Sequence, residues 1–434
     1  MAETDERADA VARTVETVFR MERARLIGGL ARMLRDLTRA EDLAQDALVA
    51  ALATWPETGI PANPGAWLMA TARRRAVDHL RHDRMRGRKL AELAQTPAAA
   101  VPDHDGLRRI ARAEAAMDDD LGDEVLGLIF TACHPVLTRE ARAALTLRLI
   151  GGLATDEIAR AFLVKEATMA QRLVRARKTL SAAGLAWEIP RGPALAPRLA
   201  SVLEVIYLIF NEGYAATAGP DLTRPALCAE ARRLGRVLAA AMPADPEVLG
   251  LKALMDIQAS RLAARIAPDG SAVPLDAQDR RRWDRLLISQ GLDALAQAEG
   301  LAWRLAETRG PYTLQAALAA CHARAPDFAA TDWMRIAGLY DDLELVMPSP
   351  VVTLNRAVAH GMAHGPEAGL AIAMTLATLP ALAGYAPLPA VIGDLLCRAG
   401  RKAEAREHFV DAAGLTRNAR ERFHLLARAA ACGT

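Results

Sequence analysis

The 434-residue sequence is poor in aromatic side chains, which make up only 4% of it, although hydrophobic residues make up 52%. Alanine and leucine recur throughout the chain, and both are good helix formers. A core of such residues favours helices packed on helices over packed sheets. We therefore expect an all-α protein, and its length predicts roughly two to four domains.

Paired cysteine motifs are also absent. The five cysteines are odd in number and widely spread, and no two of them form a C-x-x-C: Cys133, Cys228, Cys321, Cys397 and Cys432. The spacing predicts neither a disulfide framework nor a zinc ribbon, so we expect buried, reduced thiols.

Enzyme signatures are missing as well. The sequence has no phosphate-binding glycine loop, no G-x-S-x-G and no catalytic Cys/His signature. His360 and His364 are four residues apart, a spacing that suits a metal ion on one helix face. However, Gly361 and Gly365 weaken such a helix, and no third ligand is apparent. We expect no enzymatic activity, no cofactor and no metal.

Long uncharged apolar runs and a signal peptide are lacking. No stretch of about 18 apolar residues is free of charge, and the start, "MAETDERADAVART", is acidic where a signal peptide is basic and then apolar. We therefore expect a cytoplasmic protein without a membrane association.

Charge, in contrast, is strongly segregated. The net charge is only +2, yet residues 72–90 hold eight Lys/Arg against two Asp, and residues 91–124 hold nine Asp/Glu against three Arg. A basic block followed by an acidic one predicts binding to a polyanion, with an acidic counterpart in the same chain.

Apolar periodicity predicts helices along most of the chain. Residues 8–54 have apolar side chains at steps of three and four, the prolines and glycines of 55–65 interrupt them, and a helix from about Ala66 carries the arginine block. Residues 91–118 have the composition of a linker with a short helix at its end. A second helical unit follows at about 120–185, and proline-rich residues 188–197 close it.

The segment 153–180, "LATDEIARAFLVKEATMAQRLVRARKTL", has the pattern of two short helices with a break between them. Thr155 is a candidate cap, and the second helix has one apolar side formed by Met169, Leu173, Ala176 and Leu180. Basic residues project from the remaining surface. This pattern is typical of a helix-turn-helix that inserts its second helix into the major groove of DNA. An ordinary helical hairpin with a solvated basic face is an open alternative.

Three ordered motifs resemble the sigma-70 family of bacterial transcription initiation factors, in particular its extracytoplasmic-function (ECF) group, over about residues 10–185. "AEDLAQDALVAALATW" at 40–55 resembles region 2.2, which binds core RNA polymerase. "NPGAWLMATARRRAVDHLRHDRMR" at 63–86 resembles regions 2.3 and 2.4, which melt and read the −10 promoter element. Residues 152–180 resemble region 4.2, which reads the −35 element.

The resemblance implies three sets of site residues. The core-polymerase set comprises Glu41, Asp42, Gln45 and Asp46. The −10 set comprises Trp55, Asn63, Trp67, Arg73, Arg74, Arg81 and Arg84, since unstacked bases are held by aromatic surfaces beside cations. The −35 set comprises Lys165, Thr168, Gln171, Arg172, Arg175, Arg177 and Lys178. Tryptophans in the core and arginines on a merely solvated face are the alternatives for the −10 set.

Some positions depart from the family pattern. Leu163 stands where the helix-turn-helix break usually has glycine, Arg74 where many relatives have asparagine, and Arg39 where aspartate is common. The acidic linker resembles those that thread through the nucleic-acid channels of polymerase, and a plain charged tether is an equally simple interpretation.

About 247 residues follow the sigma-like part. "VIYLIFNEGYAAT" at 205–217 and "GPYTLQAALAACHA" at 310–323 resemble an ECF subgroup with a helical middle domain and an extension of tetratricopeptide (TPR) type. The spacing of Gly393, Ala405, Phe409 and Ala412 fits that repeat, in which small residues let two helices approach closely. The resemblance implies a regulatory extension. Stacked helix pairs create a concave surface for a peptide or for the protein's own sigma domains, and a passive tail is the alternative.

One charged and aromatic cluster in the extension is a candidate domain interface, or else a surface with one buried tryptophan: Asp279, Arg280, Arg282, Trp283 and Asp284. The expected domains are sigma region 2 at 8–90, an acidic linker at 91–118, sigma region 4 at 119–187, a helical middle domain at 188–295 and a TPR-like domain at 296–434. The expected partners are core RNA polymerase and promoter DNA. A helix-turn-helix repressor with a TPR scaffold, acting without polymerase, is the alternative function.

Overall fold

The computed structural model describes residues 2–93, 123–162, 164–184, 189–215, 223–267, 271–416 and 419–432. Within these ranges the chain forms helices and no strand, apart from a β-bridge between Ile266 and Ala272. The expected all-α fold is confirmed. The chain divides into two compact units, Met1–Val205 and Ile206–Thr434. This boundary lies inside the helical middle domain expected at 188–295, so the five-domain division stays a prediction.

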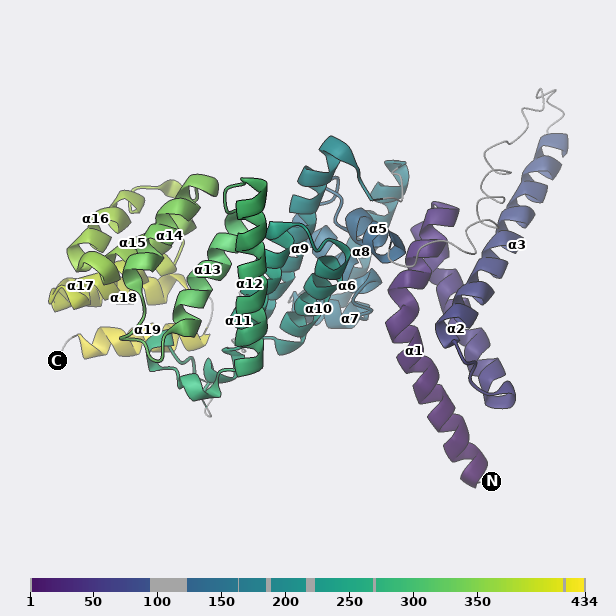
Figure 1. Cartoon of the computed structure of the whole chain (residues 1–434), viewed down its shortest axis with the longest axis horizontal. Coiled ribbons are helices and arrows are strands. Elements are labelled where there is room, and N and C mark those ends of the chain that lie inside the picture. The colour runs from purple at the N-terminus through teal and green to yellow at the C-terminus, as the bar shows by residue number, and fades with distance from the viewer. Residues whose placement is uncertain are drawn as a thin grey trace. The chain divides into compact units, whose positions relative to one another are not determined.

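The first unit begins with three long helices that lie side by side (Figure 1): α1 (Ala2–Leu34), α2 (Leu37–Thr58) and α3 (Pro64–Leu93). The expected linker at 91–118 lies outside the described residues from 94 onward. Shorter helices follow: α5 (Asp123–Ala132), α6 (Arg139–Leu149), α7 (Thr155–Ala161), α8 (Glu166–Ala182) and the 3-10 turn η2 (Gly192–Ala194).

A corner at Arg35 and Asp36 divides the expected helical segment 8–54 into α1 and α2. Arg35 adopts a left-handed backbone conformation with φ of 54°, and Asp36 caps α2 by accepting a hydrogen bond from the Arg39 N–H at 3.1 Å. The corner folds α2 back along α1, so its apolar face is buried: Leu37, Ala40, Ala44, Ala47, Ala51 and Trp55.

The helix α9 (Leu195–Tyr214) begins in the first unit and ends in the second. Its first half is fixed to α5 and α6 by polar contacts. Arg198 donates to the Phe130 carbonyl of α5 at 2.6 Å, Ser201 donates to the carbonyl of Cys133, which follows α5, at 2.6 Å, and Arg142 of α6 donates to the Glu204 carboxylate at 3.2 Å. Residues Gly192–Tyr214 are long and apolar enough to cross a membrane. That property is weak evidence, because a core helix held by such contacts has the same length and composition.

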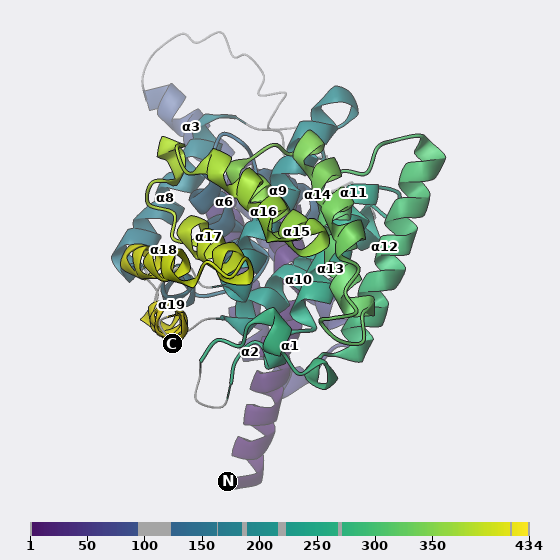
Figure 2. The same cartoon turned by 90° about the vertical axis from the view of Figure 1, so that its left-hand side faces the viewer.

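The second unit continues the helical pattern: α10 (Pro225–Ala241), α11 (Pro246–Ala259), α12 (Arg285–Leu305), α13 (Pro311–Arg324), α14 (Trp333–Val346), α15 (Pro350–His364), α16 (Pro366–Leu376), α17 (Pro387–Arg398), α18 (Lys402–Leu415) and α19 (Ala419–Ala431). Proline is the first residue of six of these helices, where its fixed φ suits the helix and its missing N–H is not needed. From α10 onward each helix packs against the next, as Figure 2 shows for α15 to α18.

The residues with TPR spacing form a helical hairpin, as predicted. A Cβ on Gly393 of α17 would lie 3.1 Å from both the Ala405 carbonyl and the Phe409 ring of α18, so the small residue permits the close approach. In the preceding pair, a Cβ on Gly369 of α16 would lie 2.9 Å from Gly361 of α15. Ala405, Phe409 and Ala412 are fully buried between their helices.

Within the second unit, one carboxylate of α11 caps the start of α13. Glu247 accepts hydrogen bonds from the Tyr312 N–H at 2.8 Å, the Thr313 N–H at 3.0 Å and the Thr313 hydroxyl at 2.6 Å. Burial raises the pKa of Glu247, and these hydrogen bonds act in the opposite direction. The first amides of a helix have no partner within it, so a carboxylate at this end satisfies them and complements the helix dipole.

We predict that Glu247→Ala lowers the free energy of unfolding by about 1–3 kcal/mol, because it leaves buried donors without an acceptor. Urea unfolding followed by circular dichroism measures the change. Glu404→Ala, which removes an exposed carboxylate paired with Arg401, serves as the control and should shift stability by less than about 0.5 kcal/mol. Equal losses in both variants would contradict the capping role.

Candidate nucleic-acid interface

The helices α7 and α8 form the expected helix-turn-helix. Ala154, rather than Thr155, occupies the N-cap position of α7 and makes no side-chain cap; the Glu157 carboxylate accepts from the Ala154 N–H at 2.7 Å. Leu163, in the break, lies outside the described residues. The apolar side of α8 is buried as its spacing predicted, through Met169, Leu173, Ala176 and Leu180. The opposite side of α8 is therefore available for contacts.

Most of the −35 set lies on this opposite side. Five of its side chains are exposed, and they follow one another along the helix at steps of three or four: Lys165, Thr168, Gln171, Arg175 and Lys178. Arg172 is half-buried. These residues form an exposed ridge with three cations and two hydrogen-bonding side chains, the chemistry with which a helix contacts phosphates and base edges in the major groove.

Arg177 is the exception in this set, because it lies against α2. Its Nη2 is 2.5 Å from Oε2 of Glu41, and the two side chains are only 20% and 13% exposed. Two further arginines approach Oε1 of Glu41: Arg23 of α1 at 3.3 Å and Arg148 of α6 at 3.8 Å. Burial lowers the pKa of the Arg23 guanidinium. In this conformation a residue of the expected core-polymerase set thus pairs with one of the expected −35 set.

The aromatic part of the −10 set is largely enclosed. Trp55 is 1% exposed and belongs to the core of the first unit, with Trp67 packed edge-on against it at a centroid distance of 5.4 Å. Trp67 is half-buried, so it is the tryptophan that retains exposed surface. Asn63 is exposed and accepts a hydrogen bond from the Ala66 N–H at 3.0 Å, which caps the start of α3.

The arginines of the −10 set differ in their surroundings. Arg74 and Arg81 are exposed on α3. Arg73 is half-buried, and its guanidinium lies 3.0 Å from the carboxylate of Glu124 on α5. The side chain of Arg84 lies outside the described residues. The structure therefore leaves an exposed basic surface on α3 but assigns Arg73 a contact within the protein.

The outer face of α2 contains more than the acidic residues expected from the sequence. Asp42, Gln45 and Asp46 are exposed on it, and the next positions on the same face are Val49 and Leu52, which are 57% and 42% exposed. An exposed apolar pair beside carboxylates is typical of a protein-binding surface. Val49 is four residues from Gln45 and Leu52 is three residues from Val49, and this spacing was the available signal.

The charged and aromatic cluster at 279–284 fixes a contact inside the second unit. Arg280 is 8% exposed, donates to the Ala325 carbonyl at 2.7 Å and stacks on the buried ring of Trp283 at 4.9 Å. Asp279 caps the turn η5 (Arg280–Arg282), and Asp284 caps α12, while Arg282 is exposed. The contact with Ala325 joins the expected middle domain to the expected TPR-like domain, but both residues lie in one compact unit. The expected interface role therefore stays a prediction.

The residues considered for a metal ion have other contacts. His360 lies 3.1 Å from the carboxylate of Asp341, and its ring centroid is 5.4 Å from that of His364. In the described part of the chain, no group of three or more His, Cys, Asp or Glu side chains is arranged to hold a metal ion.

Comparison with known protein families gives matches in the same order along the chain as the motifs in the sequence. Sigma-70 region 2 matches residues 18–86, which cover most of α1 to α3. Sigma-70, region 4 matches residues 128–180, which include α7 and nearly all of α8. A family of unknown function matches residues 198–299. No solved structure gives a significant match.

Relatives of two kinds are found. An uncharacterized protein of Rhizobium meliloti (strain 1021) is 42% identical over 400 residues, which are 92% of this chain and 91% of the relative. The probable RNA polymerase sigma-C factor of Mycobacterium bovis and the ECF RNA polymerase sigma factor SigC of Mycobacterium tuberculosis are each 31% identical over 151 residues, 34% of this chain and 72% of theirs. With both sigma regions matched in order, the chain belongs to the sigma-70 family and is of the ECF type.

Proposed function

We propose that the protein directs core RNA polymerase to specific promoters and initiates transcription there. In this proposal the outer face of α2 binds polymerase, the region around α3 opens and reads the −10 element, and α8 reads the −35 element. The observation that carries the proposal is the exposed ridge of the helix-turn-helix, which includes Lys165, Gln171, Arg175 and Lys178. A separate basic helix, α3, precedes it in the chain. Two cationic modules in one chain suit two sites on one promoter.

The C-terminal extension is proposed to regulate this activity. In support, α9 leads into the extension and its first half packs on α5 and α6, where Glu204 pairs with Arg142 at 3.2 Å. Contact of the remaining extension with the sigma domains is part of the proposal. Because polymerase and promoter DNA are in the cytoplasm, we propose that the protein acts there and that it has no enzymatic activity of its own.

Run-off transcription with purified protein and core polymerase tests the main proposal. Transcripts from a promoter that core polymerase alone ignores are the expected result. Tight binding to duplex DNA without polymerase, together with no polymerase-dependent transcript, would instead favour a helix-turn-helix repressor.

The exposed ridge of α8 and its half-buried neighbour Arg172 yield a prediction on DNA affinity. Arg175→Ala should weaken binding of the −35 element by about 1–3 kcal/mol if the guanidinium contacts a base, and Arg172→Ala should act in the same direction. Binding of polymerase holoenzyme to promoter DNA at several salt concentrations provides the measurement. If Arg175 contacts a phosphate instead, its variant should reduce the salt slope by about one.

The matched control is Arg406→Ala, which removes an exposed arginine of α18 in the second unit. Unchanged promoter affinity in both α8 variants would refute the assignment of α8 to the −35 element.

The exposed face of α2 yields a second prediction. Val49→Asp and Leu52→Asp should each weaken binding to core polymerase at least about tenfold, which corresponds to about 1.4 kcal/mol. Both side chains are exposed, so the fold should remain intact by circular dichroism. Met374→Asp, at a residue of α16 with 54% exposure, is the control; equal effects of all three variants would contradict a specific polymerase face.

A further inference from the structure

Two of the five cysteines meet in the last helices of the second unit. The Sγ atoms of Cys397 on α17 and of Cys432, which directly follows α19, are 3.9 Å apart, and the Cys432 thiol donates to Cys397. Both thiols are free in the structure. A disulfide needs its sulfur atoms at about 2.0 Å, and a change of rotamer about the Cα–Cβ bond of a cysteine moves Sγ far enough to close the difference. The two thiols are therefore neighbours at a distance from which a disulfide can form.

A neighbouring ion pair holds α17 and α19 in the register that this pair of thiols needs. Arg428 of α19 pairs with Asp394 of α17, and its guanidinium lies over the Phe409 ring of α18 at 4.5 Å. Asp394 and Cys397 are three residues apart, and Arg428 and Cys432 are four residues apart. On each segment the charged residue and the thiol therefore share a face, and the ion pair keeps the two faces together.

The two thiols differ in their access to solvent. Cys432 is 8% exposed, whereas Cys397 is half-buried. Burial and the neighbouring Cys397 thiol raise the pKa of Cys432, while Arg428 and Lys402 act in the opposite direction. Oxidants attack the more accessible thiol of such a pair, and the second thiol then resolves the product. Cys397 is thus the thiol that is attacked, and Cys432 is the resolving thiol.

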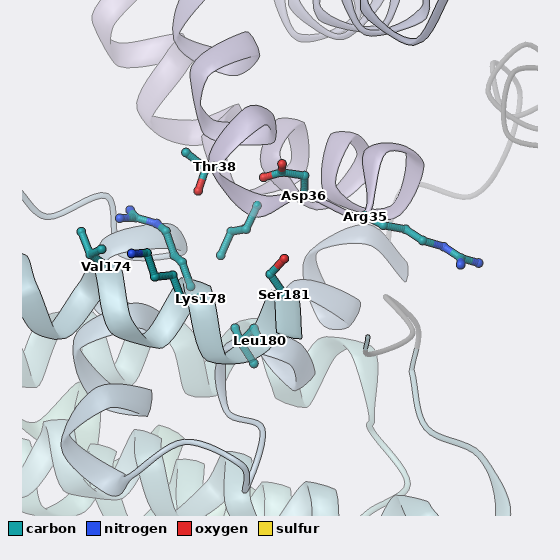
Figure 3. Close-up of a pocket in the computed structure, with 9 residues that line it drawn as sticks. Arg35, Asp36, Thr38, Val174, Lys178, Leu180 and Ser181 are labelled. Atoms are coloured by element: carbon teal, nitrogen blue, oxygen red, sulfur yellow. The ribbon is translucent and has the colours of Figure 1, made fainter. Parts of the chain in front are cut away.

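The other three cysteines are less accessible. Cys133 is fully buried, and burial raises its pKa to about 11. Burial also raises the pKa of Cys228 to about 12, and Cys321 is buried as well. A small oxidant that enters the cavity of about 380 Å³ between the start of α2 and α8 meets no thiol there, because none of the residues that line this cavity is a cysteine (Figure 3). Oxidation is therefore expected to be selective for the pair on α17 and α19.

We propose that Cys397 and Cys432 are a redox modification site, which a hydroperoxide converts into a reversible disulfide. With hydrogen peroxide, the Cys397 thiolate forms an S–O bond, the O–O bond breaks, and the leaving oxygen is protonated to water. The Cys432 thiolate then attacks the sulfur of this sulfenic acid, so that the S–S bond forms, the S–O bond breaks and a second water leaves. The two thiols together lose two electrons and two protons, and the peroxide is reduced to two molecules of water.

The disulfide locks α19 onto α17. In the reduced protein α19 packs on the core through Leu425, Ala429 and Cys432, while Phe423 is 74% exposed. A helix with so few buried side chains at the end of a helical array is among the segments that unfold locally most easily. A bond from Cys397 to Cys432 closes a loop around α18 and limits how far α19 can separate. This change needs neither polymerase nor DNA, so the inference stands apart from the proposed function.

Mass spectrometry of the full-length protein tests the modification. The reduced protein is treated with hydrogen peroxide, its remaining thiols are alkylated, and it is digested without reductant. We expect a pair of peptides joined through Cys397 and Cys432, with a loss of two free thiols per chain that dithiothreitol restores. Cys397→Ser and Cys432→Ser should each abolish the joined peptides. Cys321→Ser, the matched substitution at a buried cysteine of α13, should leave them unchanged.

Hydrogen–deuterium exchange provides the second measurement. Residues 419–431 should exchange at least about tenfold more slowly in the oxidised than in the reduced wild type, whereas residues 225–241 of α10 should not change. Loss of thiols without the joined peptides, a disulfide to another cysteine, or a disulfide with unchanged exchange in α19 would overturn the proposal. Both measurements are made on the wild type, so they remain decisive if a variant does not fold.

Discussion

The carboxylate of Glu41 on α2 lies where three other helices, α1, α6 and α8, meet. It draws Arg23, Arg148 and Arg177 to one point, and with the close contact of Glu124 on α5 against two glycines of α1 it fixes how region 4 packs on region 2. Both contacts contain charge pairs that are largely shielded from solvent, and together they give the two regions a defined arrangement.

The contact between the two regions explains why the expected site residues divide into an exposed group and a paired group. Residues on the outer sides of the helices, such as Asp42 on α2 and Arg175 on α8, are exposed for partners. Residues on the facing sides, such as Glu41 and Arg177, are paired with each other. Helical periodicity determines both groups, since positions three or four residues apart share a face.

Much of the fold followed from the sequence. The apolar face of α8, the helix-turn-helix and the close approach at Gly393 depend on local spacing, which one sequence contains. The corner at Arg35, the cap at Ala154 and the cap of α13 by Glu247 were not predicted, because a left-handed backbone or a distant carboxylate leaves no periodic signal. For the candidate site, the basic and apolar faces were predictable. A core position for Trp55 was one of two alternatives that the sequence left open. The pairing of Arg73 with Glu124 was not predicted, because it depends on contacts between segments far apart in the sequence.

The central claim is that α2 binds core polymerase and α8 binds promoter DNA. Hydrogen–deuterium exchange of the full-length protein, alone, bound to core polymerase, and bound to core polymerase with promoter DNA, tests it most directly. The account predicts that residues 37–58 gain protection when polymerase binds and that residues 166–182 gain protection when promoter DNA is added. Unchanged exchange in both segments, or a gain of protection in α8 with none in α2, would contradict it.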